Sequence, residues 1–264
     1  MASLSPDEID AYHRDGIVIP RFRLPKPKVD RLVDELDRVI AANPGVRPEK
    51  LISIHVEKGA EGIDGSRAFL DLARDPDVLD LVEVLIGPDL ILWGCHMFCK
   101  TAGDGLEVPW HQDGHYWPIR PLATCTVWIA LERSDSENGC LRVVPGSHRN
   151  RVLHAHMKEA GDLALSDKIE ATAFDEDEAY DVVLEPGQMS LHDVYMIHGS
   201  AANRSSRRRA GLAIRYMPAT SLLDRGILEP GDGSGVMVDF SRRPIWLVRG
   251  EDKTGRNDFS VGHV

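Results

Sequence analysis

The order of the expected secondary-structure elements limits the folds open to this chain more than any other feature. Apolar residues recur at helical spacing over residues 26–43 and 68–86, the second run being interrupted at Asp75-Pro76. An earlier helix is expected after the capping sequence Ser5-Pro6-Asp7-Glu8. Beyond residue 88, short strand-like runs follow at 90–100, 125–132, 140–144, 180–184, 189–191 and 212–217. Helices followed by strands predict a mainly β fold, an antiparallel barrel or two-sheet jelly roll buttressed by N-terminal helices.

The length of the chain favours one domain. The 264 residues are 42% hydrophobic, which suits one large barrel or sandwich better than two domains of half the size. We expect residues 1–264 to form this single domain. Residues 1–88 would give mainly helical support, residues 89–220 the β core and residues 221–264 a C-terminal extension.

Charge and apolar patterning exclude several kinds of partner. The formal net charge is -11 and the one dense basic run is Arg207-Arg208-Arg209, which argues against a nucleic-acid partner. No stretch approaches the roughly 20 apolar residues of a membrane helix, and the first residues contain no signal-like apolar run. We expect a cytoplasmic protein with a small-molecule substrate and no membrane partner; nothing indicates an oligomeric state. Buried thiols are expected for Cys95, Cys99, Cys125 and Cys140.

A histidine and an aspartate two residues apart are the first candidates for a metal site. They lie in the segment Trp110-His111-Gln112-Asp113-Gly114. On an extended strand, residues i and i+2 point to the same face with backbones about 6–7 Å apart, close enough to bind one ion. Gln112 would then point away. Alone, the motif is more typical of a hydrogen-bonded His-Asp pair than of a metal site.

A distal histidine and an arginine complete the pattern. His198 is followed eleven residues later by Arg209. Two histidines and one carboxylate leave three metal positions open, the arrangement in which non-haem Fe(II) oxygenases bind a cosubstrate and O2. If the cosubstrate is 2-oxoglutarate, Arg209 suits its distal carboxylate because a guanidinium binds a carboxylate through two parallel hydrogen bonds. We expect a β-hairpin through residues 203–206 to bring Arg209 beside His198.

Other histidines compete for the metal. Eleven residues beyond His192 lies Asn203, which cannot hold a carboxylate as a cation does. We therefore expect His192 to lie behind the ligands or in the core. His154 and His156 have the spacing of two ligands in a cupin-like zinc or manganese site, and their role stays open.

Further motifs run along nearly the whole chain. They are Tyr12-His13-Arg14-Asp15-Gly16, Trp110-His111-Gln112-Asp113, Thr126-Val127-Trp128-Ile129-Ala130-Leu131, Glu137-Asn138-Gly139-Cys140-Leu141, Val144-Pro145-Gly146-Ser147-His148, and His198-Gly199-Ser200 with Asn203, Ser205 and Arg209. Through these motifs the chain resembles the phytanoyl-CoA dioxygenase family of Fe(II)/2-oxoglutarate oxygenases.

The resemblance implies a double-stranded β-helix, a jelly-roll or cupin-like core with iron at the open end of the barrel. By motif position it implies His111, Asp113 and His198 as ligands of Fe(II), with 2-oxoglutarate and O2 as cosubstrates. Family halogenases carry a small residue in place of the aspartate. Because Asp113 is present, hydroxylation is the expected outcome.

The resemblance also implies contacts beyond the metal. Arg209 matches the anchor of 2-oxoglutarate and Ser200 a second contact to the same carboxylate. Lys100 and Trp128 match positions that contact the cosubstrate in relatives. Trp117 matches a position that lines the substrate pocket in some of them.

Strand alternation adds neighbours to this site. Phe98 has the parity of Lys100 and is expected to face the same pocket, whereas Trp93 and Met97 would face the other side. Arg215 has the parity of Arg209 and either binds an acidic group of the substrate or closes a structural ion pair. His115, beside the metal motif, is a candidate for substrate contact.

The sequence therefore predicts an Fe(II)/2-oxoglutarate-dependent dioxygenase. We expect it to hydroxylate an unactivated C–H bond of a small metabolite or natural-product intermediate, giving succinate and CO2. Desaturation, cyclisation and epimerisation are alternative outcomes. A non-catalytic sensor that keeps the metal and 2-oxoglutarate sites, and a zinc-dependent hydrolase or isomerase, are the alternatives from other classes.

Overall fold

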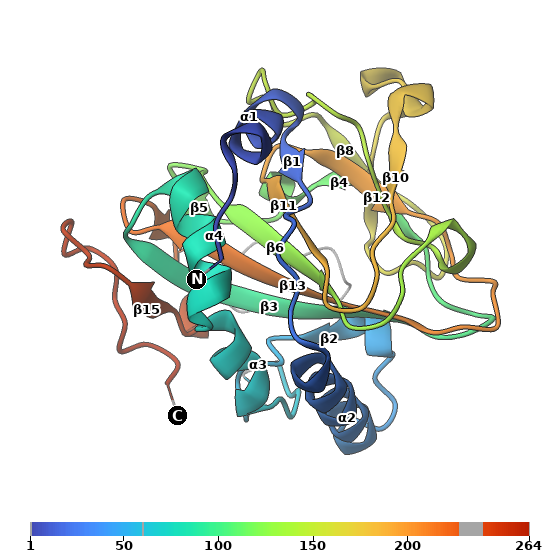
Figure 1. Cartoon of the computed structure of the whole chain (residues 1–264), viewed down its shortest axis with the longest axis horizontal. Helices are drawn as coiled ribbons and strands as arrows, with labels where there is room; N and C mark the ends of the chain where they lie inside the picture. Colours follow the sequence, from blue (N-terminus) through green and yellow to red (C-terminus); the bar gives the residue numbers. More distant parts are fainter. Residues whose placement is uncertain (1, 60, 227–239, 264) are drawn as a thin grey trace.

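Two antiparallel β-sheets form the centre of the computed structural model, which describes residues 2–59, 61–226 and 240–263 (Figure 1). The larger sheet has, in spatial order, β1 (Ile17–Val18), β11 (Met189–Asp193), β6 (Cys125–Ala130), β13 (Arg209–Pro218), β3 (Leu90–Lys100) and β15 (Trp246–Arg249), with β2 (Leu51–Ile52) also paired to β3. The smaller sheet has β10 (Tyr180–Val182), β7 (Leu141–Val143), β12 (Ile197–Ser200) and β4 (Val108–Gln112). Strands in both sheets come from distant parts of the chain, and the result is the expected double-stranded β-helix, or jelly roll.

Smaller elements complete the β structure. Two short strand pairs lie outside the main sheets: β14 (Leu222–Leu223) with β5 (Ile119–Arg120), and β8 (His156–Lys158) with β9 (Asp167–Ile169). Single turns of 3₁₀ helix occupy Pro48–Lys50, Asp113–His115, Ser136–Asn138, Ala171–Ala173, Glu176–Glu178 and Phe240–Arg242. Part of the expected C-terminal extension, residues 227–239, lies outside the described residues.

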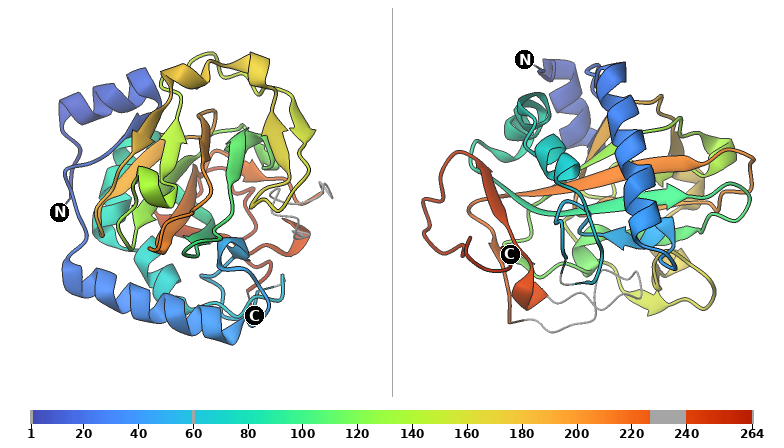
Figure 2. Two further views of the ribbon diagram at one scale, coloured as in Figure 1. Left: turned by 90° about the vertical axis from the view of Figure 1, so that its right-hand side faces the viewer. Right: turned by 90° about the horizontal axis from the view of Figure 1, so that it is seen from below.

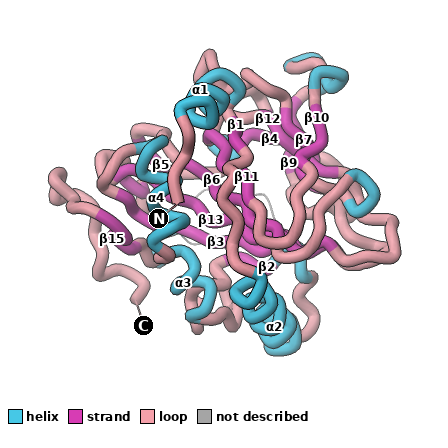
Figure 3. Tube along the Cα trace, viewed as in Figure 1, coloured by secondary structure: helices cyan, strands magenta, loops and turns pink. Residues whose placement is uncertain are grey.

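The α-helices lie around the sheets rather than between strands in a βαβ order (Figures 2 and 3). They are α1 (Pro6–Asp15), α2 (Lys26–Ala42), α3 (Arg67–Ala73) and α4 (Pro76–Ile86). The Ser5 hydroxyl accepts from the Glu8 amide, and the Glu8 carboxylate accepts from the Ser5 amide, so the expected capping box is present. The Asp75 carboxylate caps α4, which confirms the interruption predicted at Asp75-Pro76 within the apolar run of residues 68–86.

The helices bury their apolar faces against the larger sheet. Leu36 of α2, Phe69 of α3 and Leu81 of α4 are fully buried in one cluster with Met97 and Leu212 of the sheet. The opposite face of the larger sheet faces the smaller sheet. None of the helices that the structure describes is long and apolar enough to cross a membrane. All four cysteines are buried free thiols, as expected.

A β-bulge corrects one prediction of strand alternation. Residues 94 to 100 of β3 follow the expected parity, but the pairing with β13 shifts between Arg215, opposite Gly94, and Tyr216, opposite Leu92. Trp93 is the extra residue. Its ring packs edge-on against Trp117 at 4.5 Å between centroids and lies 5.8 Å from Cζ of Arg215. The prediction that Trp93 faces away from the pocket side was therefore wrong, because a bulge inverts alternation beyond it.

Candidate metal and 2-oxoglutarate site

Three side chains able to hold a metal converge between the two sheets. The Nε2 atoms of His111 and His198 lie 3.7 and 4.0 Å from Oδ1 of Asp113. One ligand atom from each residue lies within 4.8 Å of the other two, and all three residues are buried. Metal bonds of about 2.0–2.2 Å to nitrogen and oxygen, as zinc forms them, leave neighbouring ligand atoms about 3–4 Å apart. The spacing therefore fits one ion held by two histidines and one carboxylate.

The strands themselves aim the two imidazoles. Nδ1 of His111 donates to the carbonyl of Pro109 at 2.8 Å, and Nδ1 of His198 donates to the carbonyl of Met196 at 3.0 Å. A proton on Nδ1 leaves the lone pair on Nε2, which faces the centre of the cluster. His198 lies opposite His111 in the pairing of β12 with β4. Adjacent strands thus present both rings to one point.

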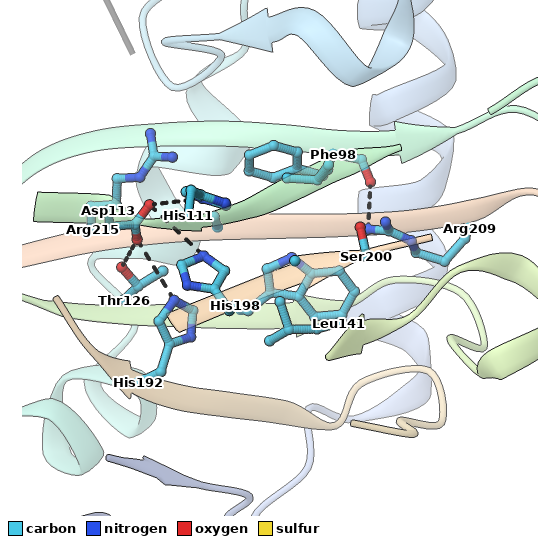
Figure 4. Close-up of a pocket in the computed structure, with 14 residues that line it drawn as sticks. Phe98, His111, Asp113, Thr126, Leu141, His192, His198, Ser200, Arg209 and Arg215 are labelled. Atoms are coloured by element: carbon cyan, nitrogen blue, oxygen red, sulfur yellow. Dashed lines mark hydrogen bonds and ion pairs between the residues drawn. The ribbon is translucent and has the colours of Figure 1, made fainter. Parts of the chain in front are cut away.

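Asp113 divides its two oxygens between different neighbours (Figure 4). Oδ1 faces His111 and His198, whereas Oδ2 accepts a hydrogen bond from Thr126 Oγ1 at 3.2 Å and lies 3.7 Å from Nε2 of His192. His192 therefore lies behind the carboxylate, where the spacing to Asn203 predicted it. Thr126 was not predicted, although its parity with Trp128 on the same expected strand identifies it.

Electrostatics favour the metal-binding forms of two of the three metal candidates. Burial alone would raise the pKa of Asp113, but hydrogen bonding to His111 and His192 holds it well below its usual value. Burial and the adjacent His111 hold the pKa of His198 well below its usual value as well. The carboxylate is ionised and the ring of His198 neutral, as a metal site requires.

A buried cation lies at the other end of the same cavity. Arg209, Ser200, Phe98 and Trp128 line this cavity together with the three metal candidates. Figure 4 shows Arg209 and Ser200 at the opposite end from Asp113. Arg209 is 2% exposed; its Nη1 donates to the carbonyl of Phe98 at 3.2 Å, and its Nε has no hydrogen-bond partner among the described residues. Burial lowers the pKa of Arg209 to about 10, so the guanidinium stays charged at neutral pH and can receive an anion.

Lys100 acts on this end of the cavity through Ser200. Its buried Nζ donates to Ser200 Oγ at 2.7 Å and to the Ser200 carbonyl at 3.2 Å, and it also donates to the carbonyl of Ala201. Burial and the charge of Arg209 hold the pKa of Lys100 well below its usual value. Lys100 is not among the residues that line the cavity. It fixes the Ser200 hydroxyl, which does line it.

The hairpin expected between His198 and Arg209 does not form. β12, with His198, belongs to the smaller sheet, whereas β13, which begins at Arg209, pairs with β3 and β6 in the larger one. The segment between them crosses from one sheet to the other. Both side chains still reach the same cavity because the inner faces of the two sheets enclose it.

The three candidate substrate residues lie in different places. Arg215 lines the cavity, and its Cζ lies 5.0 Å from the ring of Trp117, which is buried behind it. His115 is exposed and stacks on His156 at 3.9 Å between ring centroids. Neither His115 nor Trp117 is among the cavity-lining residues, whereas Leu141, Val108 and Ala213, which sequence reasoning missed, are.

Gly211 leaves the space that Trp128 occupies, and this yields a first prediction. A Cβ at position 211 would lie 1.8 Å from Cζ2 of Trp128, whose ring lies 5.3 Å from Cζ of Arg209. Gly211→Ala is expected to lower the free energy of unfolding by about 1–3 kcal/mol, because the indole must move, and so to lower Tm by several degrees. Thermal unfolding measures this. The same substitution should cost clearly less beside Trp128→Phe; an equal cost would contradict the assigned clash.

Comparisons with known proteins agree with this geometry. A family model described as phytanoyl-CoA dioxygenase matches residues 12–211. A probable phytanoyl-CoA dioxygenase of Caenorhabditis elegans is 29% identical over 96% of this chain and 94% of its own length. The solved structure of the non-heme monooxygenase ThoJ, without ligands, is similar with a TM-score of 0.73 and 26% identity, covering 93% of this chain and 85% of ThoJ. CytC3 with Fe(II) and alpha-ketoglutarate is similar with a TM-score of 0.68 and 25% identity, covering 99% of this chain and 95% of CytC3. The chain therefore belongs to the phytanoyl-CoA dioxygenase family of oxygenases, which use Fe(II), 2-oxoglutarate and O2.

Proposed function

We propose that this oxygenase hydroxylates an unactivated C–H bond of a small metabolite or natural-product intermediate. His111, Asp113 and His198 would hold Fe(II), and Arg209 would hold 2-oxoglutarate. The observation that carries the proposal is the convergence of Nε2, Oδ1 and Nε2 of the three ligands at one end of a cavity whose other end is a buried guanidinium. When bound, Fe(II) and 2-oxoglutarate supply the oxidation of a C–H bond by O2, with succinate and CO2 as coproducts.

The residues of this chain would divide the work of binding and orientation. Arg209 gives two parallel hydrogen bonds to the distal carboxylate, in a buried setting where a charge-assisted bond is strong. Ser200 accepts from Lys100 Nζ, so its own hydroxyl proton is available to the same carboxylate. Phe98 and Trp128 give the cavity apolar walls and keep water from the chain of the cosubstrate.

We propose that the substrate binds on the side of the metal that Arg215 bounds. Arg215 lines the cavity next to Asp113, and its guanidinium lies 5.8 and 5.0 Å from the rings of Trp93 and Trp117. Cation–π contacts with these two rings hold the guanidinium of Arg215 in place. Trp117 would then act through Arg215. His115, being exposed, would meet a substrate only outside the cavity.

The surface charges disfavour a CoA thioester as substrate. Phosphate groups of CoA would need basic side chains to receive them. Arg207 is paired with Asp135 and Glu137, and Arg208 with Glu132 and Asp37. The one dense basic run is therefore already neutralised, which supports a smaller substrate.

Anaerobic titration tests the assignment of Fe(II) and 2-oxoglutarate. Adding 2-oxoglutarate to the Fe(II)-loaded protein should produce a weak visible charge-transfer band, and Zn(II) in place of Fe(II) should give none. A screen of candidate compounds should then reveal one that stimulates succinate formation. A protein that gives the band but forms no succinate with any compound would favour the sensor. Absence of the band would contradict the proposed site.

A further inference from the structure

We propose that Gln112 and His156 hold the metal ligands in position and are not ligands themselves. The hydrogen bonds made by these two residues are called the clamp. The inference rests on the proposed function, since the ligands concerned are His111, Asp113 and His198. Gln112 stands between two of these ligands in sequence, points away from the cavity, and is fully buried. A fully buried amide needs hydrogen-bond partners, and these partners show which segments Gln112 connects.

The amide of Gln112 uses both its donors and its acceptor. Nε2 donates to the carbonyls of Val152 and Tyr195 at 2.9 and 2.7 Å, and Oε1 accepts from the backbone N–H of His154 at 2.8 Å. Exchanging the amide oxygen and nitrogen would set two carbonyls against an oxygen and one N–H against an NH₂ group. The orientation of the amide is therefore fixed by its surroundings.

His156 holds the backbone of the same residue. Its Nε2 accepts the N–H of Gln112 at 3.1 Å, and its Nδ1 donates to the carbonyl of His154 at 2.9 Å. The ring stacks on His115 with an angle of 10° between the planes. Burial, and secondarily the neighbouring His115, lower the pKa of His156 to about 4, which keeps Nε2 unprotonated and able to accept. His154, through its backbone, and His156, through its ring, therefore hydrogen-bond to Gln112, a role that involves no metal.

These contacts join the segments on which ligand geometry depends. Residues 152–156 and β4 are tied through the side chain and backbone of Gln112. The bond to Tyr195 ties β4 to the turn between β11 and β12, three residues before His198. Without the clamp, His111 on β4, Asp113 in the turn that follows β4 and His198 on β12 would lose the contacts that hold these segments together beyond the backbone pairing of β4 with β12.

Metal binding without turnover tests the clamp. We would titrate the full-length protein anaerobically with Fe(II) and with Co(II), whose visible spectrum reports coordination geometry. Gln112→Leu is expected to raise the Kd for both ions about tenfold, the lower end of the effect of residues that orient ligands, and to change the Co(II) spectrum. Asn43→Leu is a matched control. The buried Asn43 amide also donates to two carbonyls, of Val39 and Asp64, and accepts one backbone N–H, but it caps α2.

The outcomes separate a positioning role from a general loss of stability. Both variants should lower Tm, and only Gln112→Leu should alter Kd and spectrum. A Kd within twofold of the wild type, or an equal rise for Asn43→Leu, would overturn the clamp. If Gln112→Leu does not fold, His156→Phe is used in its place. The phenyl ring can still stack on His115 but cannot accept a hydrogen bond from the Gln112 N–H. A Kd raised about three- to tenfold supports the clamp and an unchanged Kd overturns it. If the wild type itself binds neither ion, the proposed function fails first.

Discussion

His198→Ala should reduce Fe(II)-dependent succinate formation by at least about 10³-fold, whereas His192→Ala should retain measurable turnover. His198 Nε2 faces the same carboxylate oxygen as His111 Nε2, so its loss leaves only two protein ligands. A metal contributes several kcal/mol of transition-state stabilisation, and each 1.36 kcal/mol corresponds to about tenfold in rate. His192 lies against Oδ2, the other oxygen of Asp113, and its removal should weaken metal binding roughly tenfold.

Metal content and rate must be measured together to make the comparison decisive. Bound Fe(II) per chain should fall strongly in His198→Ala and only slightly in His192→Ala when both are loaded anaerobically. Both histidines are buried, so thermal unfolding of the two variants serves as the control for a general loss of structure. Equal effects would contradict the separate roles proposed for the two histidines, and a larger effect at His192 would mean that these roles are exchanged.

The metal candidates were predictable because they depend on local geometry. The two-residue spacing of His111 and Asp113 needs only extended backbone up to Gln112, where β4 ends and the 3₁₀ turn begins. The helix caps and the break at Asp75-Pro76 likewise depend on neighbouring residues. Spacing to the arginine selected His198 over His192, and that choice agrees with the convergence of ligand atoms.

The errors arose where pairing between distant strands decides the structure. Spacing between His198 and Arg209 fits a hairpin, but β13 finds its partners in β3 and β6, far away in sequence. The bulge at Trp93 depends on the register of β13 and has no signal in β3 alone. The apolar pattern revealed neither β4 nor β12, because each strand is short and its residues are polar where the site needs them; extended backbone was expected there only from the spacing of the metal motif and from the predicted hairpin. Lys100 illustrates the same limit: parity gives its face, whereas its contact with Ser200 comes from the other sheet.

Arg209→Gln should raise KM for 2-oxoglutarate about 100-fold or more while leaving Fe(II) binding in the absence of cosubstrate within a few-fold of the wild type. Hydrogen bonds to a charged partner contribute roughly 1.5–3 kcal/mol each, and the guanidinium supplies two. Arg209→Lys should recover little, because a lysine offers a point charge without the planar fork, and Lys100 already lies nearby with its donors committed to Ser200 and Ala201.

Arg207→Gln is the matched control for this prediction, because it removes the same charge two residues away at a surface ion pair with Asp135 and Glu137. Its KM for 2-oxoglutarate should stay near that of the wild type, since surface pairs contribute about 0–1 kcal/mol and none of that acts in the cavity. A comparable rise in KM for both variants would indicate a general electrostatic effect. An unchanged KM in Arg209→Gln would mean that another residue binds the distal carboxylate. Among the described residues, the other buried cation that lines this cavity is Arg215. A rise in KM confined to Arg209→Gln therefore places the cosubstrate anchor at Arg209.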